Sequence, residues 1–142
     1  MALDFAQEAT ALVDHFSRGR IDKVARFYAF PAVLYIGPDV LVLWEEADLR
    51  DFIETYRGIM LDRGLDHVAS DVIDTTKTEK QGFAVTVRNT FYNAQGTVIG
   101  ESAVRYFLQR ENPCLKIRLV EYLEWPFRDD LAASAAYQRL KP

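Results

Sequence analysis

The chain has 142 residues and a formal net charge of −4 at pH 7, with 49% hydrophobic and 27% charged residues. These are ordinary values for one globular domain, so residues 1–142 are expected to form a single domain. The negative charge argues against nucleic-acid binding. The longest apolar run, residues 27–36, is too short to cross a membrane.

Few residues are available for metal or cofactor chemistry. Two histidines and one cysteine, Cys114, argue against a zinc site. The glycines form neither G-x-G-x-x-G nor G-x-x-x-x-G-K-[ST], the patterns that hold nucleotide phosphates. We therefore expect no metal and no cofactor. The lone cysteine and an N-terminus without a basic, then apolar, secretory signal predict a cytoplasmic protein.

Apolar residues at helical spacing predict an amphipathic first helix that ends near Gly19: Phe5, Ala9, Leu12, Val13 and Phe16. A short second helix is expected to present Tyr28 and to end at Pro31. Strands over 32–36 and 40–44 follow, joined by a turn at 37–39. A third helix is expected from Glu46 to Arg63, because Gly64 is a suitable C-terminal cap.

Beyond Gly64 the apolar period changes from 3.6 to 2, which predicts long strands. Their expected ranges are 66–75, 83–92, 97–110 and 115–125, with turns at 93–96 and 111–114. An alanine-rich segment, 129–140, predicts a final helix. Helices followed by an antiparallel meander indicate the α+β class.

Three segments carry a resemblance to a known family. Residues 17–28, SRGRIDKVARFY, resemble an elbow between two helices, and 47–53 and 115–118 match the start of a helix and of a final strand. The chain resembles the nuclear transport factor 2-like superfamily, in particular SnoaL-like and steroid delta-isomerase-like relatives. The resemblance implies a cone-like fold, with N-terminal helices packed on a strongly curved, mainly antiparallel sheet. It also implies a cavity and, commonly, a homodimer.

The alternation along the strands predicts which face lies against the helices. Odd residues from 83 to 91 and 117 to 125, and even residues from 98 to 108, are expected to point inward. A four-residue turn at 93–96 would place Val87 opposite Ser102. On the other face it would pair Arg88 with Glu101.

This register places Glu121 among apolar inward neighbours. Desolvation would raise the pKa of its carboxyl group, so Glu121 is the candidate catalytic acid or base. The alternative is a buried glutamate held by a tyrosine hydroxyl, an arginine or a water, with no ligand involved.

Apolar walls with a few polar groups are typical of small-molecule sites. The candidate ligand-binding residues are Tyr28, Trp44, Phe52, Tyr56, Asn89, Ser102, Tyr106, Leu119 and Leu123. The aromatic members could equally be core. The inward face of strand 66–75, which carries His67 and Asp71, stays open because both faces are partly apolar.

The chemistry of the steroid isomerases does not transfer to this sequence. The resemblance places their catalytic base at Ile36, their helix tyrosine at Leu12 and their sheet aspartate near Val104. All three residues here are apolar, so isomerase activity of that kind is excluded. The first strand also lacks the carboxylates of an Asp–Arg–Asp epoxide-hydrolase site.

The outer face of the sheet is rich in arginine and aromatic residues, which favours a homodimer through that face. The alternative is that the segment from Trp125 onward folds back over it. Two functions therefore remain. One is a cavity that binds, or acts on, a small apolar ligand, such as a cyclic one. The other is a non-catalytic interaction module with a filled cavity.

Overall fold

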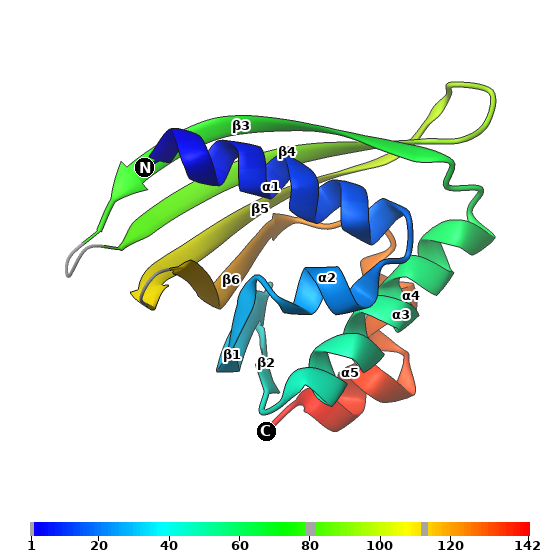
Figure 1. Cartoon of the computed structure of the whole chain (residues 1–142). Coiled ribbons are helices and arrows are strands. Elements are labelled where there is room, and N and C mark those ends of the chain that lie inside the picture. Colours follow the sequence, from blue (N-terminus) through cyan, green and yellow to red (C-terminus); the bar gives the residue numbers. More distant parts are fainter. Residues whose placement is uncertain (1, 79–81, 112–113) are drawn as a thin grey trace.

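A strongly curved six-stranded sheet forms one layer of the molecule, and helices fill its concave side (Figure 1). The computed structural model describes residues 2–78, 82–111 and 114–142, without the side chains of 2–6, 8–9 and 114–115. The strand order is β2-β1-β6-β5-β4-β3, in which only β1 and β6 pair in parallel. The strands are β1 (Tyr28–Ile36), β2 (Asp39–Leu43), β3 (His67–Lys77), β4 (Phe83–Tyr92), β5 (Val98–Glu111) and β6 (Cys114–Glu124). The α+β cone expected from the sequence is confirmed.

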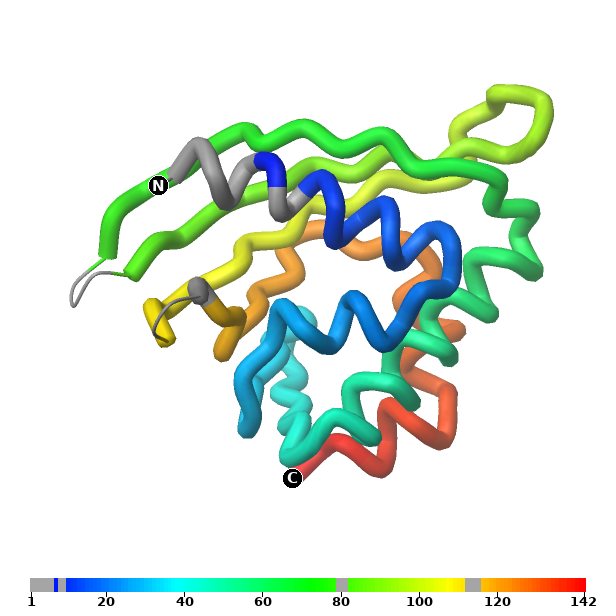
Figure 2. Tube along the Cα trace, viewed as in Figure 1, coloured from blue at the N-terminus to red at the C-terminus, as the bar shows by residue number. Residues whose placement is uncertain are grey.

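Three helices precede or interrupt the long strands: α1 (Ala2–Ser17), α2 (Ile21–Ala25) and α3 (Glu46–Asp62). In the Cα trace of Figure 2, α1 runs along the concave side of the long strands and α3 lies below it. Leu12 and Phe16 of the expected α1 stripe are buried, whereas the side chains of Phe5 and Ala9 lie outside the described residues.

The junction between α1 and α2 depends on an arginine from α3. The Arg57 guanidinium donates to the carbonyl oxygens of Phe16 and Ser17, both at 3.1 Å, and so satisfies groups that the end of a helix leaves free. Gly19, at φ +74°, then turns the chain, and a Cβ atom there would lie 3.0 Å from the guanidinium carbon.

Tyr28 lies in β1 and not on the second helix as the sequence analysis predicted. Helix α2 ends at Ala25, so the chain is already extended before Pro31. Tyr28 pairs with Ile117 of β6, and both side chains are buried. The strand thereby delivers the Tyr28 ring to the concave side.

The β4–β5 hairpin keeps the predicted inward residues from Gly100 to Leu108, but in a register shifted by two. Val98, also predicted inward, instead pairs with the outward Tyr92 and is exposed, because Ile99 is an extra residue in the strand. Asn89 lies opposite Ser102, and Val87 opposite Val104. The loop runs over 93–97, because the Asn93 side chain accepts hydrogen bonds from the backbone N–H groups of Gln95 and Thr97. This two-residue shift preserves the faces of both strands.

The predicted inward face of β6 is wrong at Leu119, Glu121 and Leu123, whereas Trp125, just past the strand, packs inward against Tyr56 as predicted. Leu108 pairs with Ile117, but Phe107 pairs with Leu119, so Arg118 is an extra residue that forms a β-bulge. From that point the alternation is reversed, and Val120 rather than Leu119 is fully buried on the concave side.

Glu121 therefore lies on the outer face, and the site proposed around it from the sequence is absent. Its carboxylate pairs with the Arg105 guanidinium at 2.8 Å, directly across the β5–β6 ladder. A carboxylate buried without a partner costs roughly several kcal/mol, whereas a bulge that turns it toward an arginine avoids that cost. Arg88 likewise pairs with Glu124 at 3.2 Å, and not with Glu101.

The pairing of β3 with β4 decides which face of β3 points inward. Val68, Ser70 and Val72 pair with the inward residues of β4, so His67 and Asp71 are exposed on the other face. His67 stacks on Tyr92, with ring centroids 4.8 Å apart, and contacts the Asp66 carboxylate at 2.9 Å.

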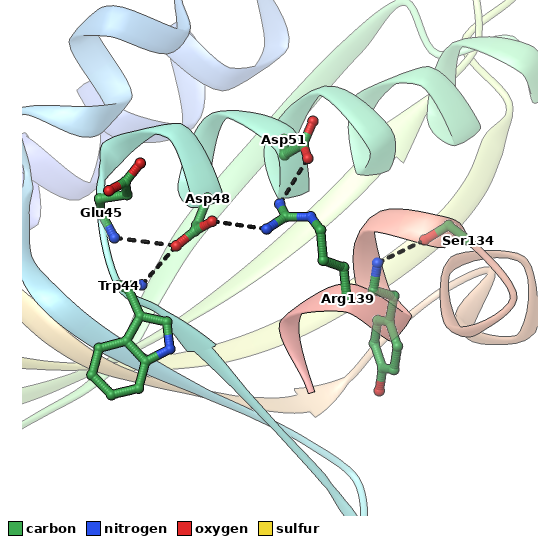
Figure 3. Close-up of polar contacts among 7 residues, drawn as sticks. Trp44, Glu45, Asp48, Asp51, Ser134 and Arg139 are labelled. Carbon is green, nitrogen blue, oxygen red and sulfur yellow. Dashed lines mark hydrogen bonds and ion pairs between the residues drawn. The ribbon is translucent and has the colours of Figure 1, made fainter. Parts of the chain in front are cut away.

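The C-terminal segment forms two short helices, α4 (Arg128–Ala132) and α5 (Ala135–Leu140), where one was predicted. Ser134 separates them and accepts the backbone N–H of Tyr137. Figure 3 shows Arg139 of α5 bridging Asp48 and Asp51 of α3. The segment therefore packs beside α3 and β2, and does not fold back over the outer face of the sheet.

Candidate functional site

A pocket of about 50 Å³ lies between the concave face of the sheet and helices α1 to α3. Its walls are mainly apolar, and its polar atoms come from four tyrosines, one asparagine and one serine. The described lining residues are Leu12, Val13, Phe16, Val24, Tyr28, Ile53, Tyr56, Asn89, Phe91, Ser102, Val104, Tyr106 and Tyr122. We call this site the tyrosine pocket. At roughly 15 Å³ per water, its space holds a few waters or part of a compact ligand.

The four tyrosines reach the pocket from four different elements: Tyr28 from β1, Tyr56 from α3, Tyr106 from β5 and Tyr122 from β6. Within the described ranges, no hydrogen bond joins any of their hydroxyl groups to another residue. Among the described residues, the fully enclosed side-chain atoms without a partner are Nδ1 of His15 and Nε1 of Trp125, so the four tyrosine hydroxyl groups each keep some accessible surface.

Burial raises the pKa of all four phenol groups above the ordinary value of 10.0. The neighbouring Tyr106 hydroxyl raises the pKa of the other three further, because two ionised phenols would repel each other. The Tyr122 side chain is partly exposed, whereas Tyr28, Tyr56 and Tyr106 are buried. All four side chains are therefore neutral near pH 7 and can donate hydrogen bonds.

The sheet wall of the pocket contains a short chain of hydrogen bonds. The Ser70 hydroxyl donates to Oδ1 of Asn89 at 2.8 Å, and Nδ2 of Asn89 donates to Oγ of Ser102 at 3.1 Å. The three residues are direct cross-strand neighbours on β3, β4 and β5. Asn89 and Ser102 are buried, so this chain forms a fixed polar wall.

Stacked rings support the pocket from behind. Tyr56 packs against Trp125 with centroids 4.4 Å apart and against Phe16 at 5.4 Å. Tyr122 meets Trp125 edge to face at 4.0 Å. Such contacts restrict the rotation of the tyrosine rings and so fix the direction in which their hydroxyl groups point.

The structure brings five of the nine predicted ligand-binding residues together on the pocket wall. These are Tyr28, Tyr56, Asn89, Ser102 and Tyr106. Their role in binding stays a prediction.

The other predicted residues lie elsewhere. Phe52 is fully buried behind the wall, with its ring centroid 6.5 Å from that of Tyr56. Trp44 is 68% exposed and points away from the core, as Figure 3 shows. Leu119 and Leu123 belong to the part of β6 where the bulge reverses the alternation, and Leu123 is exposed.

Sequence reasoning missed Tyr122, which it assigned to the outer face. The sequence did contain a signal. If Val120 and Tyr122 point inward, the charged Glu121 points outward, which avoids the free-energy cost of burying its carboxylate. It also missed the helical side of the pocket, formed by residues such as Val24 and Ile53. The sequence identified these residues only as members of the apolar faces of amphipathic helices, and not as pocket residues.

The described lining of the pocket contains no Asp, Glu, His, Lys or Arg. Among the described residues, no three or more His, Cys, Asp or Glu side chains gather where they could hold a metal ion. In the same part of the chain, no helix has the length and apolar character needed to cross a membrane.

Comparison with known families decides the relationship of this chain. The model of the family described as "NTF2-like protein (DUF6841)" matches residues 6–122. The chain belongs to this NTF2-like family. The resemblance inferred from the sequence is therefore confirmed, and the curved sheet with helices on its concave side is the NTF2-like fold.

Solved structures share the fold of this NTF2-like protein at low sequence identity. Aln2 from a Streptomyces species has 17% identity and a TM-score of 0.70, over 92% of this chain and 91% of that chain. A domain of unknown function with a cystatin-like fold from Nostoc punctiforme has 15% identity and a TM-score of 0.69, over 96% and 88%.

An NTF2-like protein from Novosphingobium aromaticivorans has 13% identity and a TM-score of 0.64, over 96% of this chain and 85% of that chain. A comparison with curated proteins finds no match. Identities this low establish a common fold and carry no activity across.

Proposed function

We propose that this protein binds a small, largely apolar and uncharged molecule in the tyrosine pocket. The observation that carries the proposal is the group of four tyrosine side chains that line a mainly apolar pocket and whose hydroxyl groups have no hydrogen bond to another described residue. A ligand or ordered waters in the pocket would supply partners for these hydroxyl groups, since a buried hydroxyl left unpaired costs about 1–3 kcal/mol.

The lining favours binding over acid–base catalysis. Within its described part, no side chain has a pKa near 7, and the tyrosine pKa values are raised further from that range. The positions that resemble the isomerase base and donors are Ile36, buried in the core, and Leu12 and Val104 on the pocket wall. A proton would have no ordinary base to receive it.

The proposal is tested by titrating compact cyclic molecules, such as toluene and cyclohexanone, into protein with isotopically labelled tyrosine. Saturable NMR shifts of the Tyr28, Tyr56, Tyr106 and Tyr122 rings are expected. Val104→Phe, which places a ring in the pocket, is expected to weaken binding at least about tenfold. Val42→Phe adds the same ring on the outer face and leaves binding unchanged.

Two outcomes would overturn binding in this pocket. One is the absence of saturable shifts for every molecule of the panel. The other is equal loss, or equal retention, of binding in the two phenylalanine variants, since only Val104 lines the pocket. Circular dichroism on both variants verifies that the fold is kept.

A second function, self-association, is supported by an apolar strip on the outer face. Val42, Val33, Leu119 and Phe107 are cross-strand neighbours on β2, β1, β6 and β5, and all four are partly exposed. We call these four residues the outer strip. Because contiguous apolar surface of this kind marks association sites, we propose that the strip joins two copies in a homodimer.

A further inference from the structure

Trp125 touches both the tyrosine pocket and the solvent. Its ring packs against Tyr56 with centroids 4.4 Å apart and meets Tyr122 edge to face at 4.0 Å, and both tyrosines line the pocket. Trp125 is itself partly exposed. The ring therefore covers part of the tyrosine wall at a place from which it can turn to the solvent while the core stays packed.

The pocket is too small for a whole ligand while this ring is in place. Its space is about 50 Å³, whereas small-molecule sites usually enclose about 300–1,000 Å³. The sheet wall is fixed by the ladder hydrogen bonds of its strands. Trp125 lies between Glu124, the last residue of β6, and Arg128, the first of α4. A movement of Trp125 therefore enlarges the pocket and leaves both elements intact.

Two features show that the closed position of the Trp125 ring costs free energy. Nε1 of Trp125 is fully enclosed and has no hydrogen-bond partner among the described residues. An indole N–H can only donate, so in this position it loses the hydrogen bond that it would make to water. Phe127, two residues further on, has φ 58°, a left-handed conformation that strains a bulky residue. Such strain is typical of segments that move in function.

An arginine at the end of α3 holds this segment in place. The Arg63 guanidinium carbon lies 4.6 Å from the centroid of the Phe127 ring, and the same guanidinium pairs with Asp130 of α4. The side chains of Arg63 and Asp130 are about half exposed, and surface pairs of this kind add little to the stability of a fold. Pro126 links Phe127 to Trp125 with a fixed φ, so a change at Arg63 reaches the Trp125 ring.

We propose that Trp125 is the gate of the tyrosine pocket. Its ring turns away from Tyr56 and Tyr122 to admit a ligand, and Arg63 holds it in the closed position. This inference rests on the proposed binding function and adds the residue that limits ligand size. Since only open molecules bind, the fraction of open molecules lowers the apparent affinity in proportion.

Hydrogen exchange of the two indole N–H groups measures the gate. The protein has two tryptophans, and Trp44, which is 68% exposed, is the internal reference for an accessible N–H. In the ligand-free protein the Trp125 N–H is expected to exchange slowly. Saturation with indane, an apolar two-ring molecule, is expected to raise its exchange rate at least about tenfold and to leave that of Trp44 unchanged.

Arg63→Ala tests whether the segment is held closed. The variant removes both contacts of the guanidinium, so open molecules become more frequent. The Trp125 N–H of the free protein should then exchange faster, and the affinity for indane should rise about threefold or more. Arg50→Ala is the matched control, because this arginine forms its ion pairs with Asp22 of α2 and Glu46 of α3. It should leave both quantities unchanged.

The outcomes separate the two proposals. If neither indane nor any smaller molecule of the panel shifts the tyrosine rings, the proposed function is overturned and the gate with it. If ligands bind but the Trp125 N–H stays protected, the gate is overturned while binding stands. Equal indane affinities of Arg63→Ala and Arg50→Ala, or weaker binding by Arg63→Ala, would also overturn the gate, because a ring with a purely structural role binds no better when its support is removed.

Discussion

At the scale of single residues, the described lining of the tyrosine pocket consists of neutral side chains. The three positions that resemble the catalytic residues of steroid isomerases carry Ile36, Leu12 and Val104, while the polar atoms come from tyrosines and from the Asn89–Ser102 pair. Neutral donors in an apolar wall can orient a ligand but supply no strong base. The described lining therefore lacks the charged residues that the resemblance to steroid isomerases would place there.

Gly100 of β5 lets Pro126 pack closely against the strand. A Cβ atom at Gly100 would lie 2.8 Å from Cβ of Pro126, whose ring cannot turn away. Gly100→Ala is expected to push the Pro126–Phe127 segment outward and to lower the free energy of unfolding by about 1–3 kcal/mol. Urea denaturation measures this change.

The matched control is the same substitution in α3. A Cβ atom at Gly58 would have no neighbour within 4 Å, so Gly58→Ala should stabilise the protein by about 0.5–1 kcal/mol through helix propensity. If both variants shift the unfolding free energy in the same direction, the close contact with Pro126 does not determine which side chain residue 100 can carry.

At the scale of elements, the start of α3 depends on one carboxylate. Asp48 accepts the backbone N–H groups of Trp44 at 2.9 Å and Glu45 at 3.2 Å, and pairs with Arg139 of α5 at 3.0 Å (Figure 3). Partial burial by itself would raise the pKa of Asp48, but these hydrogen bonds outweigh it and hold the pKa below 3.8. The ionised form thus stabilises the fold.

The sign of the pH dependence follows from that lowered pKa. The stabilisation is complete above pH 3.8 and is lost as the pH falls through the lower pKa of the folded state. Asp48→Asn should therefore reduce the unfolding free energy by about 1–2 kcal/mol at pH 7. The difference from the wild type should shrink below pH 3.8, as measured by urea denaturation across pH.

Asp51→Asn provides the control, since Asp51 also pairs with Arg139, at 2.7 Å, but is exposed and accepts no backbone N–H among the described contacts. Its effect at pH 7 should be smaller than that of Asp48→Asn. An equal effect of the two variants would show that the Arg139 ion pair, and not the helix cap, carries the stabilisation.

The elements themselves were predictable from the sequence, and the faces of one strand were not. Apolar periods located α1, α3 and the long strands to within a few residues, because periodicity follows directly from burial. Periodicity does not locate a bulge in the same way. Arg118 fits the alternation of its neighbours, yet this extra residue turns the Glu121 side chain outward and the Tyr122 side chain inward. The site prediction failed at that residue.

Asn89 of β4 and Ser102 of β5 were correctly predicted to point inward, although the predicted register of their hairpin was wrong by two positions. A shift by an even number of residues leaves both side chains on the predicted face. Trp44 shows the opposite case. It was predicted to line the core or the cavity because an aromatic ring can form a flat wall for a ligand, whereas the residue follows an edge strand and lies exposed at the start of α3.

At the scale of the whole molecule, the two proposed functions occupy opposite faces of one sheet. The tyrosine pocket is on the concave side, and the outer strip is on the convex side, flanked by the Arg105–Glu121 and Arg118–Glu111 ion pairs. The C-terminal helices leave the strip uncovered because they pack on α3 and β2 (Figure 1). A homodimer through the strip would therefore leave the pocket available to a ligand.

The dimer is tested at Leu119, the central residue of the outer strip, which neighbours both Val33 and Phe107. Leu119→Glu would bury an unpaired carboxylate in the interface, so the dimer dissociation constant should rise about a hundredfold or more. Leu61→Glu is the control, because Leu61 is 45% exposed on α3, in the helical layer, and should leave association unchanged. Sedimentation velocity over a concentration series measures the association of both variants.

A wild type that stays monomeric over the whole concentration series would rule out this interface. Equal dissociation of the two variants would rule it out as well. Leu119 lies outside the pocket lining, so ligand binding should survive in monomeric Leu119→Glu, which makes the two functions separable in one protein.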